Sequence, residues 1–481
     1  MPTSPLAPSR LAGALAAALL LGTAASAALA QEVPLTAESR RSLTLTVYNQ
    51  NLGLVSETRR VELPAGESLL AIEDVSGQLQ PESVLLAAQG LRVIEQSLAA
   101  DLLTPQRLLE ASVGQTVQLI RTHPDTGADI VEEARVLSLA GGMVLQIGDR
   151  IEISPPGRIV FTGMPAGLRS EPALLARVFP GQAGPNDLRL DYLTAGLSWR
   201  ADYVARLNAA SDRLDLQALV TLSNATDTDF SGATLRLVAG EVNQGGAMPS
   251  PQPIFKARQE SMAMAASAQD MAAPVAAADR YVYSLQRPVT LRRGETKQIP
   301  LMSAQGVKVT REYRFDDRLH AYRGGPEEDP VNADIVLELV NDPDLGLGAP
   351  LPAGTVRVYG PSESGEAATL FLGADAIGHT PEGEKARLTI GQAFDVTARA
   401  ELLVDERLSS SSYETGQKIT VRNAKEEAVE VIVARTLPRG WTMREESAPH
   451  ETESANRIAW RLTVPAGGEA ELTYRIRVEN Q

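Results

Sequence analysis

Apolar side chains recur at every second position through most of this chain, and this alternation restricts the fold more than any other feature of the sequence. It is clearest in the stretch 188–243, where Trp199 and Tyr203 share one parity and Arg200 and Asp202 share the other. Successive side chains of a β-strand point to opposite faces, so a period of two is the pattern of a half-buried strand. We therefore predict that Trp199 and Tyr203 lie on a buried face and that the charged residues form a solvated one.

Turn residues interrupt this alternation about every ten positions, which is typical of β-sandwiches. We expect an all-β, multi-domain antiparallel β-sandwich architecture with an immunoglobulin-like C-terminal sandwich. One short helix is expected over residues 102–112, where Thr104 can cap the first turn and Pro105 can open it. The expected segments are a signal peptide (1–30), an N-terminal β domain (31–185), the first part of a central β domain (186–243), an insert (244–280), the second part of the central domain (281–398) and a C-terminal β-sandwich (399–481).

Residues 244–280 break the alternation with repeated Ala, Met, Gln, Ser and Pro and with few large apolar side chains. Such a segment buries too little surface to offset its conformational entropy, so we expect a disordered insert. Thioethers are soft ligands that suit Cu(I), which leaves copper handling by the insert as an open hypothesis. A linker without a ligand is the interpretation we prefer, because no histidine lies nearby. The methionines concerned are Met248, Met262, Met264 and Met271.

The first thirty residues have the pattern of a cleavable secretory signal peptide. Arg10 precedes an apolar core, and Ala28 and Ala30 form a small-x-small cleavage site before Gln31. The core is too short to act as a membrane anchor, and no later run approaches the roughly 18 apolar residues of a spanning helix, so no transmembrane segment is expected in the mature chain. Lysine is rare among the 45 basic residues, which fits a high-GC bacterium. We expect cleavage after Ala30 and a periplasmic or secreted protein.

Acidic residues outnumber basic ones by 60 to 45, which gives a net charge of −15 at pH 7. A phosphate backbone repels an acidic chain, so we expect no nucleic-acid partner. The chain contains no cysteine, which excludes disulfides, thiolate catalysis and thiolate metal ligands. Its stability must then come from packing and from sheet pairing.

Several separated motifs occur in a fixed order: YLTAGLSWRADYVARL, VTLSNATDTDFSGATLRLVAGEVN, LPAGTVRVYG, LFLGADAIGHTPEGEKARLTIGQAFDVTA and TLPRGW. Together they resemble the bacterial family known as domain of unknown function 4139, with matching order and spacing over roughly Leu43 to Val478. The same domain is similar to the C-terminal half of the mucoidy inhibitor A-like proteins. Those proteins carry a coiled coil ahead of it that this chain lacks, so functions tied to the coil are not implied. The resemblance implies a fold and an exported location, and it brings no catalytic motif.

Two stretches have the letters of hydrolase motifs without the rest of the pattern. Asp125-Thr126-Gly127 could belong to an aspartic-protease loop, but the chain has no second copy, and Pro-Asp-x-Gly is the composition of a hairpin turn. Ser198 lies in Gly-Leu-Ser-Trp-Arg, which lacks the second glycine of a nucleophile elbow and is predicted to be strand.

Asn224, Asp227 and Asp229, with Gly232 beyond them, offer closely spaced oxygen ligands of the kind that Ca²⁺ uses. The full EF-hand loop with its terminal glutamate is missing, and such residues also make ordinary turns between strands. We prefer the turn interpretation and keep the ion as the alternative.

The remaining polar candidates are single residues or alternating charges. Arg200, Asp202 and Arg206 could hold a carboxylated ligand, although alternating charges on a strand usually form a solvated cross-strand face. The histidines show no paired metal-binding spacing, which argues against a zinc hydrolase of the usual kind. They are His123, His320, His379 and His450.

The sequence therefore assigns no catalytic, cofactor-binding or metal-ligating residue, and no cofactor is expected. The favoured hypothesis is a non-enzymatic cell-envelope binding or scaffold protein whose partner is an envelope protein or a surface polymer. The alternative is an envelope hydrolase or metal-dependent enzyme whose carboxylates converge only in the fold. Copper handling through the insert is a third and weaker hypothesis. The sequence leaves the oligomeric state open.

Overall fold

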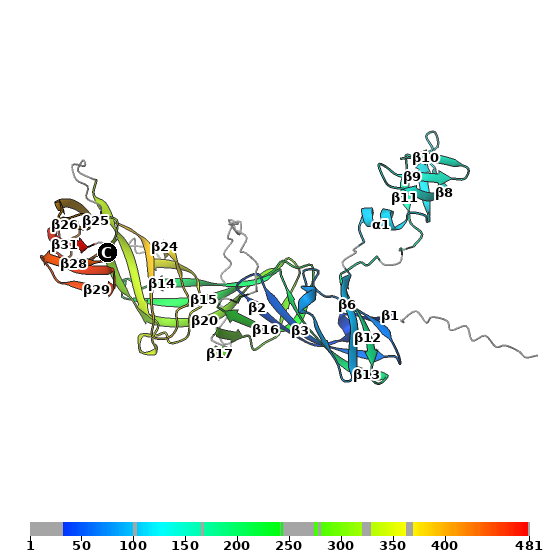
Figure 1. Ribbon diagram of the computed structural model, residues 1–481, viewed down its shortest axis with the longest axis horizontal. Coiled ribbons are helices and arrows are strands. Elements are labelled where there is room, and N and C mark those ends of the chain that lie inside the picture. Colours follow the sequence, from blue (N-terminus) through cyan, green and yellow to red (C-terminus); the bar gives the residue numbers. More distant parts are fainter. Residues whose placement is uncertain are drawn as a thin grey trace, which may run out of the picture.

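The computed structural model describes residues 32–99, 103–163, 165, 168–240, 242–243, 274–277, 280–319, 329–361 and 369–479. Most of this part of the chain is strand, as predicted, and the strands form five sheets in an elongated arrangement (Figure 1). The expected signal peptide and residues 244–273 of the expected insert, with its four methionines, lie outside the described residues. No helix within the described ranges is long and apolar enough to cross a membrane.

The first sheet has four strands in the order β1-β4-β12-β6, and only β1 and β4 are parallel. The 3-10 turns η1 (Ala37–Ser39) and η2 (Pro81–Ser83) lie just after β1 and just before β5 in the chain. The strands of this sheet are β1 (Glu32–Leu35), β4 (Ser68–Glu73), β6 (Leu91–Ala99) and β12 (Ala173–Pro180).

The second sheet has eight strands in the order β17-β18-β16-β2-β3-β13-β5, with β19 also paired to β16. Strands β2 and β16, which are far apart in the sequence, are parallel neighbours in it. Its strands are β2 (Arg40–Tyr48), β3 (Gly53–Leu63), β5 (Leu85–Ala87), β13 (Gly184–Thr194), β16 (Phe230–Ala239), β17 (Val275–Ala277), β18 (Arg280–Ser284) and β19 (Val289–Leu291).

The third sheet has five strands in the order β20-β15-β14-β23-β24. The chain enters it from β13 through Gly196, which has a φ of +85° and where an added Cβ would lie 2.7 Å from a Thr226 methyl carbon. Only glycine meets both conditions at this crossing. The strands are β14 (Leu197–Leu207), β15 (Arg213–Asn224), β20 (Thr296–Lys308), β23 (Gly354–Pro361) and β24 (Thr369–Ile377).

One continuous hydrophobic core runs through these three sheets. The side chains of Trp199 and Tyr203 lie in it and are 2% and 0% exposed, which confirms the face that the alternation predicted. The Tyr203 hydroxyl donates to the carbonyl of Pro352 at 2.7 Å, and burial raises the pKa of this phenol far above its ordinary value. The apolar face of the stretch 188–243 therefore belongs to the core that the second and third sheets share.

A fourth sheet with its own small core stands apart from the elongated body (Figure 1). Its strand order is β10-β9-β8-β7-β11. The predicted helix precedes it as α1 (Pro105–Ala111), and the Thr104 hydroxyl accepts a hydrogen bond from the Arg107 amide as an N-cap. The strands are β7 (Thr116–Thr122), β8 (Asp129–Ser138), β9 (Val144–Ile147), β10 (Arg150–Ile153) and β11 (Arg158–Val160).

The fifth sheet has nine strands in the order β28-β31-β26-β25-β22-β21-β27-β30-β29 and encloses a second core. Part of β22 and β25 packs instead in the core of the first three sheets, through Leu337, Leu339, Ala386 and Leu388. Its two edge strands, β28 and β29, are consecutive in the chain, and the rings of Trp441 and His450 on them are 5.8 Å apart. The 3-10 turn η4 (Pro343–Leu345) follows β22. The strands are β21 (Thr310–Asp316), β22 (Val331–Val340), β25 (Lys385–Arg407), β26 (Ser412–Asn423), β27 (Val429–Thr436), β28 (Trp441–Glu446), β29 (His450–Ser454), β30 (Arg457–Val464) and β31 (Glu469–Glu479).

The sheets do not follow the expected segment boundaries. Strand β25 crosses residue 399, and β21 and β22, which were expected in the central domain, belong to the C-terminal sheet. The expected N-terminal domain divides between three sheets, because β2 and β3 join the second sheet while β7 to β11 form the fourth. Residues 275–277 of the expected insert form β17, which pairs with β18. Alternation identifies a strand and its buried face but leaves its pairing partner undetermined.

Three buried asparagines close the ends of strands in the same way: Asn224 is the last residue of β15, Asn341 directly follows β22, and Asn423 is the last residue of β26. The Nδ2 of each donates to backbone carbonyls of turns that cross the strand end. The Asn423 Nδ2, for example, donates to the carbonyls of Glu427, Val464 and Pro465 at 2.8, 3.3 and 3.0 Å. A buried carbonyl needs such a partner, so these side chains are part of the sheet architecture.

Candidate functional site

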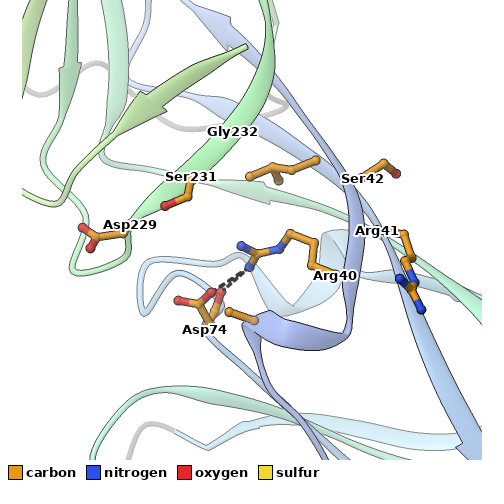
Figure 2. A pocket seen from close by; sticks show the side chains of 9 residues that line it. Arg40, Arg41, Ser42, Asp74, Asp229, Ser231 and Gly232 are labelled. Carbon is orange, nitrogen blue, oxygen red and sulfur yellow. Dashed lines mark hydrogen bonds and ion pairs between the residues drawn. The ribbon is translucent and has the colours of Figure 1, made fainter.

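A polar hollow of about 420 Å³ lies where β2 and β16 begin (Figure 2). The parallel pairing of these strands brings their first residues to the same side, and the turn after β4 adds Asp74 from another sheet. We call this feature the Arg40 hollow. Its lining consists of Ala37, Arg40, Arg41, Ser42, Leu43, Asp74, Asp229, Ser231 and Gly232.

Arg40 lies at the centre of the hollow, where Figure 2 shows its contact with Asp74, and it also pairs with the carboxylate of Glu57. Its Nε donates to Glu57 Oε2 at 2.6 Å, and its Nη2 donates to Asp74 Oδ2 at 2.9 Å and to the Asp74 carbonyl at 3.3 Å. Burial alone would lower the pKa of Arg40, but the charges and hydrogen bonds of Glu57 and Asp74 outweigh it and raise the pKa. The guanidinium is therefore a fixed positive charge.

A second, fully buried arginine lies next to this pair. The side chain of Arg59 is 0% exposed, and its Nε donates to Glu57 Oε1 at 2.8 Å while its Nη1 donates to the Leu35 carbonyl at 2.6 Å. Its Nη2 is also 2.8 Å from Glu57 Oε1 but makes no hydrogen bond. The guanidiniums of Arg40 and Arg59 thus balance the carboxylates of Glu57 and Asp74 in and beside the hollow.

The rim of the Arg40 hollow mixes hydrogen-bond donors and acceptors. Asp229 and Asp74 lie on the same side of Arg40, whereas Arg41 points away from it (Figure 2). The Oδ1 of Asp229 accepts from the backbone amide of Arg293 at 2.7 Å, which fixes the carboxylate beside Ser231 at the start of β16. Hydroxyl, carboxylate and guanidinium groups in one concave surface can hydrogen-bond a polar segment or a saccharide.

The residues considered as calcium ligands do not converge on one point. The Asn224 Nδ2 donates hydrogen bonds to three backbone carbonyls, and its Oδ1 accepts one from the Thr226 amide. The Oδ1 of Asp227 accepts from the Gly77 amide at 3.0 Å, whereas the Oδ1 of Asp229 accepts from the Arg293 amide. Within the ranges that the structure describes, no group of three or more His, Asp or Glu could hold a metal ion. These side chains hydrogen-bond to separate turns.

The two stretches that have the letters of hydrolase motifs lie in a turn and in a strand. Residues 125–127 form the turn between β7 and β8, where Gly127 has a φ of +69° and its amide donates to the His123 carbonyl at 3.0 Å. Ser198 lies inside β14, as predicted, and is half-buried. Neither stretch lines the Arg40 hollow.

The solvated face predicted for β14 is wrong at Asp202. Arg200 is exposed as expected, but the Asp202 side chain is 9% exposed, accepts from the Thr221 hydroxyl at 2.7 Å and pairs with Arg357 at 3.0 Å. The reason is that β14 is an inner strand of its sheet, so side chains from β15 and β23 cover the carboxylate from both sides. Arg206, nearer the end of β14, is exposed.

One of the histidines that were isolated in the sequence has a titratable partner in the fold. His450 Nδ1 lies 2.8 Å from Glu446 Oε2, which also accepts from the indole nitrogen of Trp460 at 2.9 Å. Burial alone would raise the pKa of Glu446, but the hydrogen bonds of His450 and Trp460 outweigh it and lower the pKa. His123 and His379 each accept from a backbone amide within the structure, and His320 lies outside the described residues.

A network of alternating charges covers part of the C-terminal sheet. The Arg314 side chain is 2% exposed and contacts Glu312 at 3.1 Å, Asp316 at 3.3 Å and Glu453 at 3.0 Å. Burial alone would raise the pKa of Glu453, but the hydrogen bond and charge of Arg314, together with Arg457, outweigh it and lower the pKa below the ordinary 4.5. The folded state therefore binds fewer protons at this site than the unfolded chain does.

The lowered pKa of Glu453 predicts that the C-terminal sheet loses stability in acid. The contribution of Glu453 to stability is complete above its ordinary pKa of 4.5 and is lost as the pH falls through its lowered folded pKa. Glu453→Gln is expected to lower the free energy of unfolding by about 1 kcal/mol at pH 7. It should also make the decrease of this free energy below pH 4.5 less steep. Urea midpoints measured from pH 3 to pH 7 test this, and an unchanged acid limb in the variant would contradict it.

Sequence reasoning missed the Arg40 hollow because its parts are distant in the chain. One signal was available, since Glu57 and Arg59 have the same parity on β3 as the apolar Val55 and Val61. Two charged residues on a predicted core face indicate a buried ion pair. The partner Asp74 gives no comparable signal, because it lies in a turn and reaches Arg40 only through the fold.

Comparison with known proteins adds one finding. The family model described as domain of unknown function (DUF4139) matches residues 188–480. This span is shorter than the resemblance from Leu43, so β2 and β3 lie outside the match although they pair with strands inside it. The Arg40 hollow is built from both parts, since Asp229 and Ser231 fall within the match and Arg40 and Asp74 precede it. The comparison with curated proteins finds no match.

Proposed function

The chain belongs to the family of the domain of unknown function DUF4139, and from its sheet architecture and the Arg40 hollow we propose a non-enzymatic β scaffold of the cell envelope. It binds an envelope protein or a surface polymer, and a polar part of that partner enters the Arg40 hollow. The expected signal peptide supports the envelope as the location. The observation that carries the proposal is the bridging of Glu57 and Asp74 by Arg40.

This bridging favours binding over acid–base chemistry. A general acid or base must reach the proton that it transfers. Glu57 is 2% exposed behind Arg40, and Asp74 directs a carboxylate oxygen and its carbonyl to the same guanidinium. Exposed groups of the rim, namely Ser42, Ser231 and Asp229, remain for contact with a partner. A preformed polar surface on paired strands loses little entropy when a ligand binds.

A photo-reactive side chain in the hollow tests this proposal. We expect p-benzoylphenylalanine in place of Ser231 to cross-link one saturable partner from envelope extracts. The same group in place of Thr126, an exposed turn residue of the fourth sheet, is the matched control and should give no such product. If Ser231 and Thr126 positions give the same products, the hollow is not a specific contact site.

One observation favours a second candidate, an envelope hydrolase, because the carboxylates of Asp74 and Asp229 line one hollow. Such an enzyme would turn over glycan or peptide substrates and lose this activity in Asp229→Asn. Asp227→Asn is the control, since Asp227 is near in the chain but does not line the hollow. Turnover that is equal in both variants, or absent from the unmodified protein, would count against the hydrolase.

Copper binding by the methionines of residues 244–273 stays a prediction, which titration with Cu(I) tests.

A further inference from the structure

Phe394 is the most exposed large apolar side chain in the part of the chain that the structure describes, at 89%. Single apolar residues on a protein surface are common and need no explanation by themselves. Phe394 differs because the backbone that carries it is held in place on both sides. This rigidity suggests a side chain that is presented to a partner.

The residue lies on an irregular bulge of β25. In the pairing with β22, Asn332 is opposite Thr397 and Asp334 is opposite Gln392, so one residue of β22 faces four residues of β25. The flanking side chains of Ala393 and Val396 are buried at 4% and 0%. Bulges of this kind redirect side chains and end regular pairing, often next to functional sites.

Two hydrogen bonds fix the bulge. The Asn332 Nδ2 donates to the Ala393 carbonyl at 2.8 Å. On the other side the backbone amide of Ala424 donates to the Asp395 carbonyl at 2.7 Å. The backbone at Phe394 is thus fixed by the core, by β22 and by the turn after β26, and it loses little freedom when a partner covers the side chain.

Exposed carboxylates lie next to Phe394 in the chain and on the turn that adjoins its bulge. Asp395 and, on the adjoining turn after β26, Glu426 and Glu427 are exposed, and their carboxylates make no hydrogen bond or ion pair to any described residue. Of the bases on that turn and strand, Lys425 lies over the Tyr313 ring at 5.8 Å, and Arg422 is exposed. Elsewhere in the same sheet glutamates such as Glu414 are ion-paired with arginine.

We infer that Phe394 and the carboxylates of Asp395, Glu426 and Glu427 form a docking surface for a protein partner that has an apolar pocket rimmed by Lys or Arg. The charge decides between possible occupants. A second copy of this chain would place like charges against each other, and an anionic lipid surface would be repelled for the same reason. The inference rests on the proposed binding function and adds a second contact surface with a defined partner chemistry.

Photo-cross-linking and titration test the inference. We expect p-benzoylphenylalanine in place of Phe394 to capture one protein from envelope extracts, whereas the same group in place of Ile153, which is 76% exposed on β10, does not capture it. The captured protein is then identified and purified. Its binding to the unmodified protein should weaken about thirtyfold for Phe394→Ala and less than about twofold for Ile153→Ala.

Charge variants test the acidic rim separately. The triple variant D395N, E426Q and E427Q should slow association about tenfold at low salt and remove most of its salt dependence. Phe394→Trp should keep most of the affinity, because a large apolar anchor remains. Circular dichroism and urea midpoints of every variant should match the unmodified protein, since these side chains are exposed.

Several results would overturn the inference. The first is that no protein is captured at Phe394. The second is an equal loss of affinity for Phe394→Ala and Ile153→Ala, or unchanged binding of the acidic triple variant. The third is self-association in sedimentation, or binding to phosphatidylglycerol vesicles, that Phe394→Ala abolishes. Cross-linking from Ser231 without cross-linking from Phe394 would reject this surface and keep the proposed function. Failure at both positions would reject both.

Discussion

Replacing Trp199 by alanine is expected to lower the free energy of unfolding by about 3–5 kcal/mol, as large-to-small changes in a packed core do. The side chain is 2% exposed and joins two sheets, because its indole nitrogen on β14 donates to the Val238 carbonyl on β16 at 3.1 Å. Its ring also packs edge-on against that of Tyr283, with the ring centroids 6.3 Å apart. The alanine variant would lose this contact and leave a buried carbonyl without its donor.

Urea unfolding followed by circular dichroism measures the effect without depending on tryptophan fluorescence. Arg200→Ala is the matched control, because Arg200 is adjacent on the same strand but its side chain is 63% exposed. We expect the control to change stability by no more than about 0.5 kcal/mol. Trp199→Phe should fall between the two, since it keeps most of the apolar surface and loses the N–H donor. A near-neutral Trp199→Ala would contradict the role assigned to this side chain.

Replacing Arg59 by methionine is expected to have a similar cost, about 3–5 kcal/mol, for an electrostatic reason. The change removes one of the two guanidiniums that hold the buried Glu57 carboxylate and leaves the Leu35 carbonyl without its donor. Without Arg59, Arg40 alone faces the carboxylates of Glu57 and Asp74, and a buried charge that is only partly compensated is costly. Thermal and urea unfolding at pH 7 measure the loss.

A double variant separates the charge effect from packing. Glu57→Leu combined with Arg59→Met removes both members of the pair and should lose less stability than Arg59→Met alone, because Arg40 then has only the Asp74 carboxylate to neutralise. Arg60→Met is the surface control, since Arg60 follows in the chain and its side chain is 43% exposed. A double variant that loses the sum of the single effects would show that packing of Arg59, and not its charge, stabilises the sheet.

The alternation predicted the all-β class and the correct face for Trp199 and Tyr203. The Thr104-Pro105 capping pattern placed the start of a helix, and the Pro-Asp-x-Gly composition placed residues 125–127 in a turn. These features depend on residues close in sequence, where a period of two or a capping pattern is directly visible. The same reasoning failed for Asp202, because exposure on a strand also depends on whether neighbouring strands cover its face. Thr221 and Arg357 provide that cover from β15 and β23.

The sequence by itself determined that the chain forms strands, which face of β14 is apolar and which motifs mark its family. Only the tertiary structure decided which strands pair, that β2 joins β16 in parallel, and that Arg40 meets Asp74 in a hollow. It also decided that a bulge of β25 presents Phe394 to solvent. The physical reason is that a period of two records only the two faces of a strand, whereas its neighbours are selected by contacts between residues that are far apart in the chain.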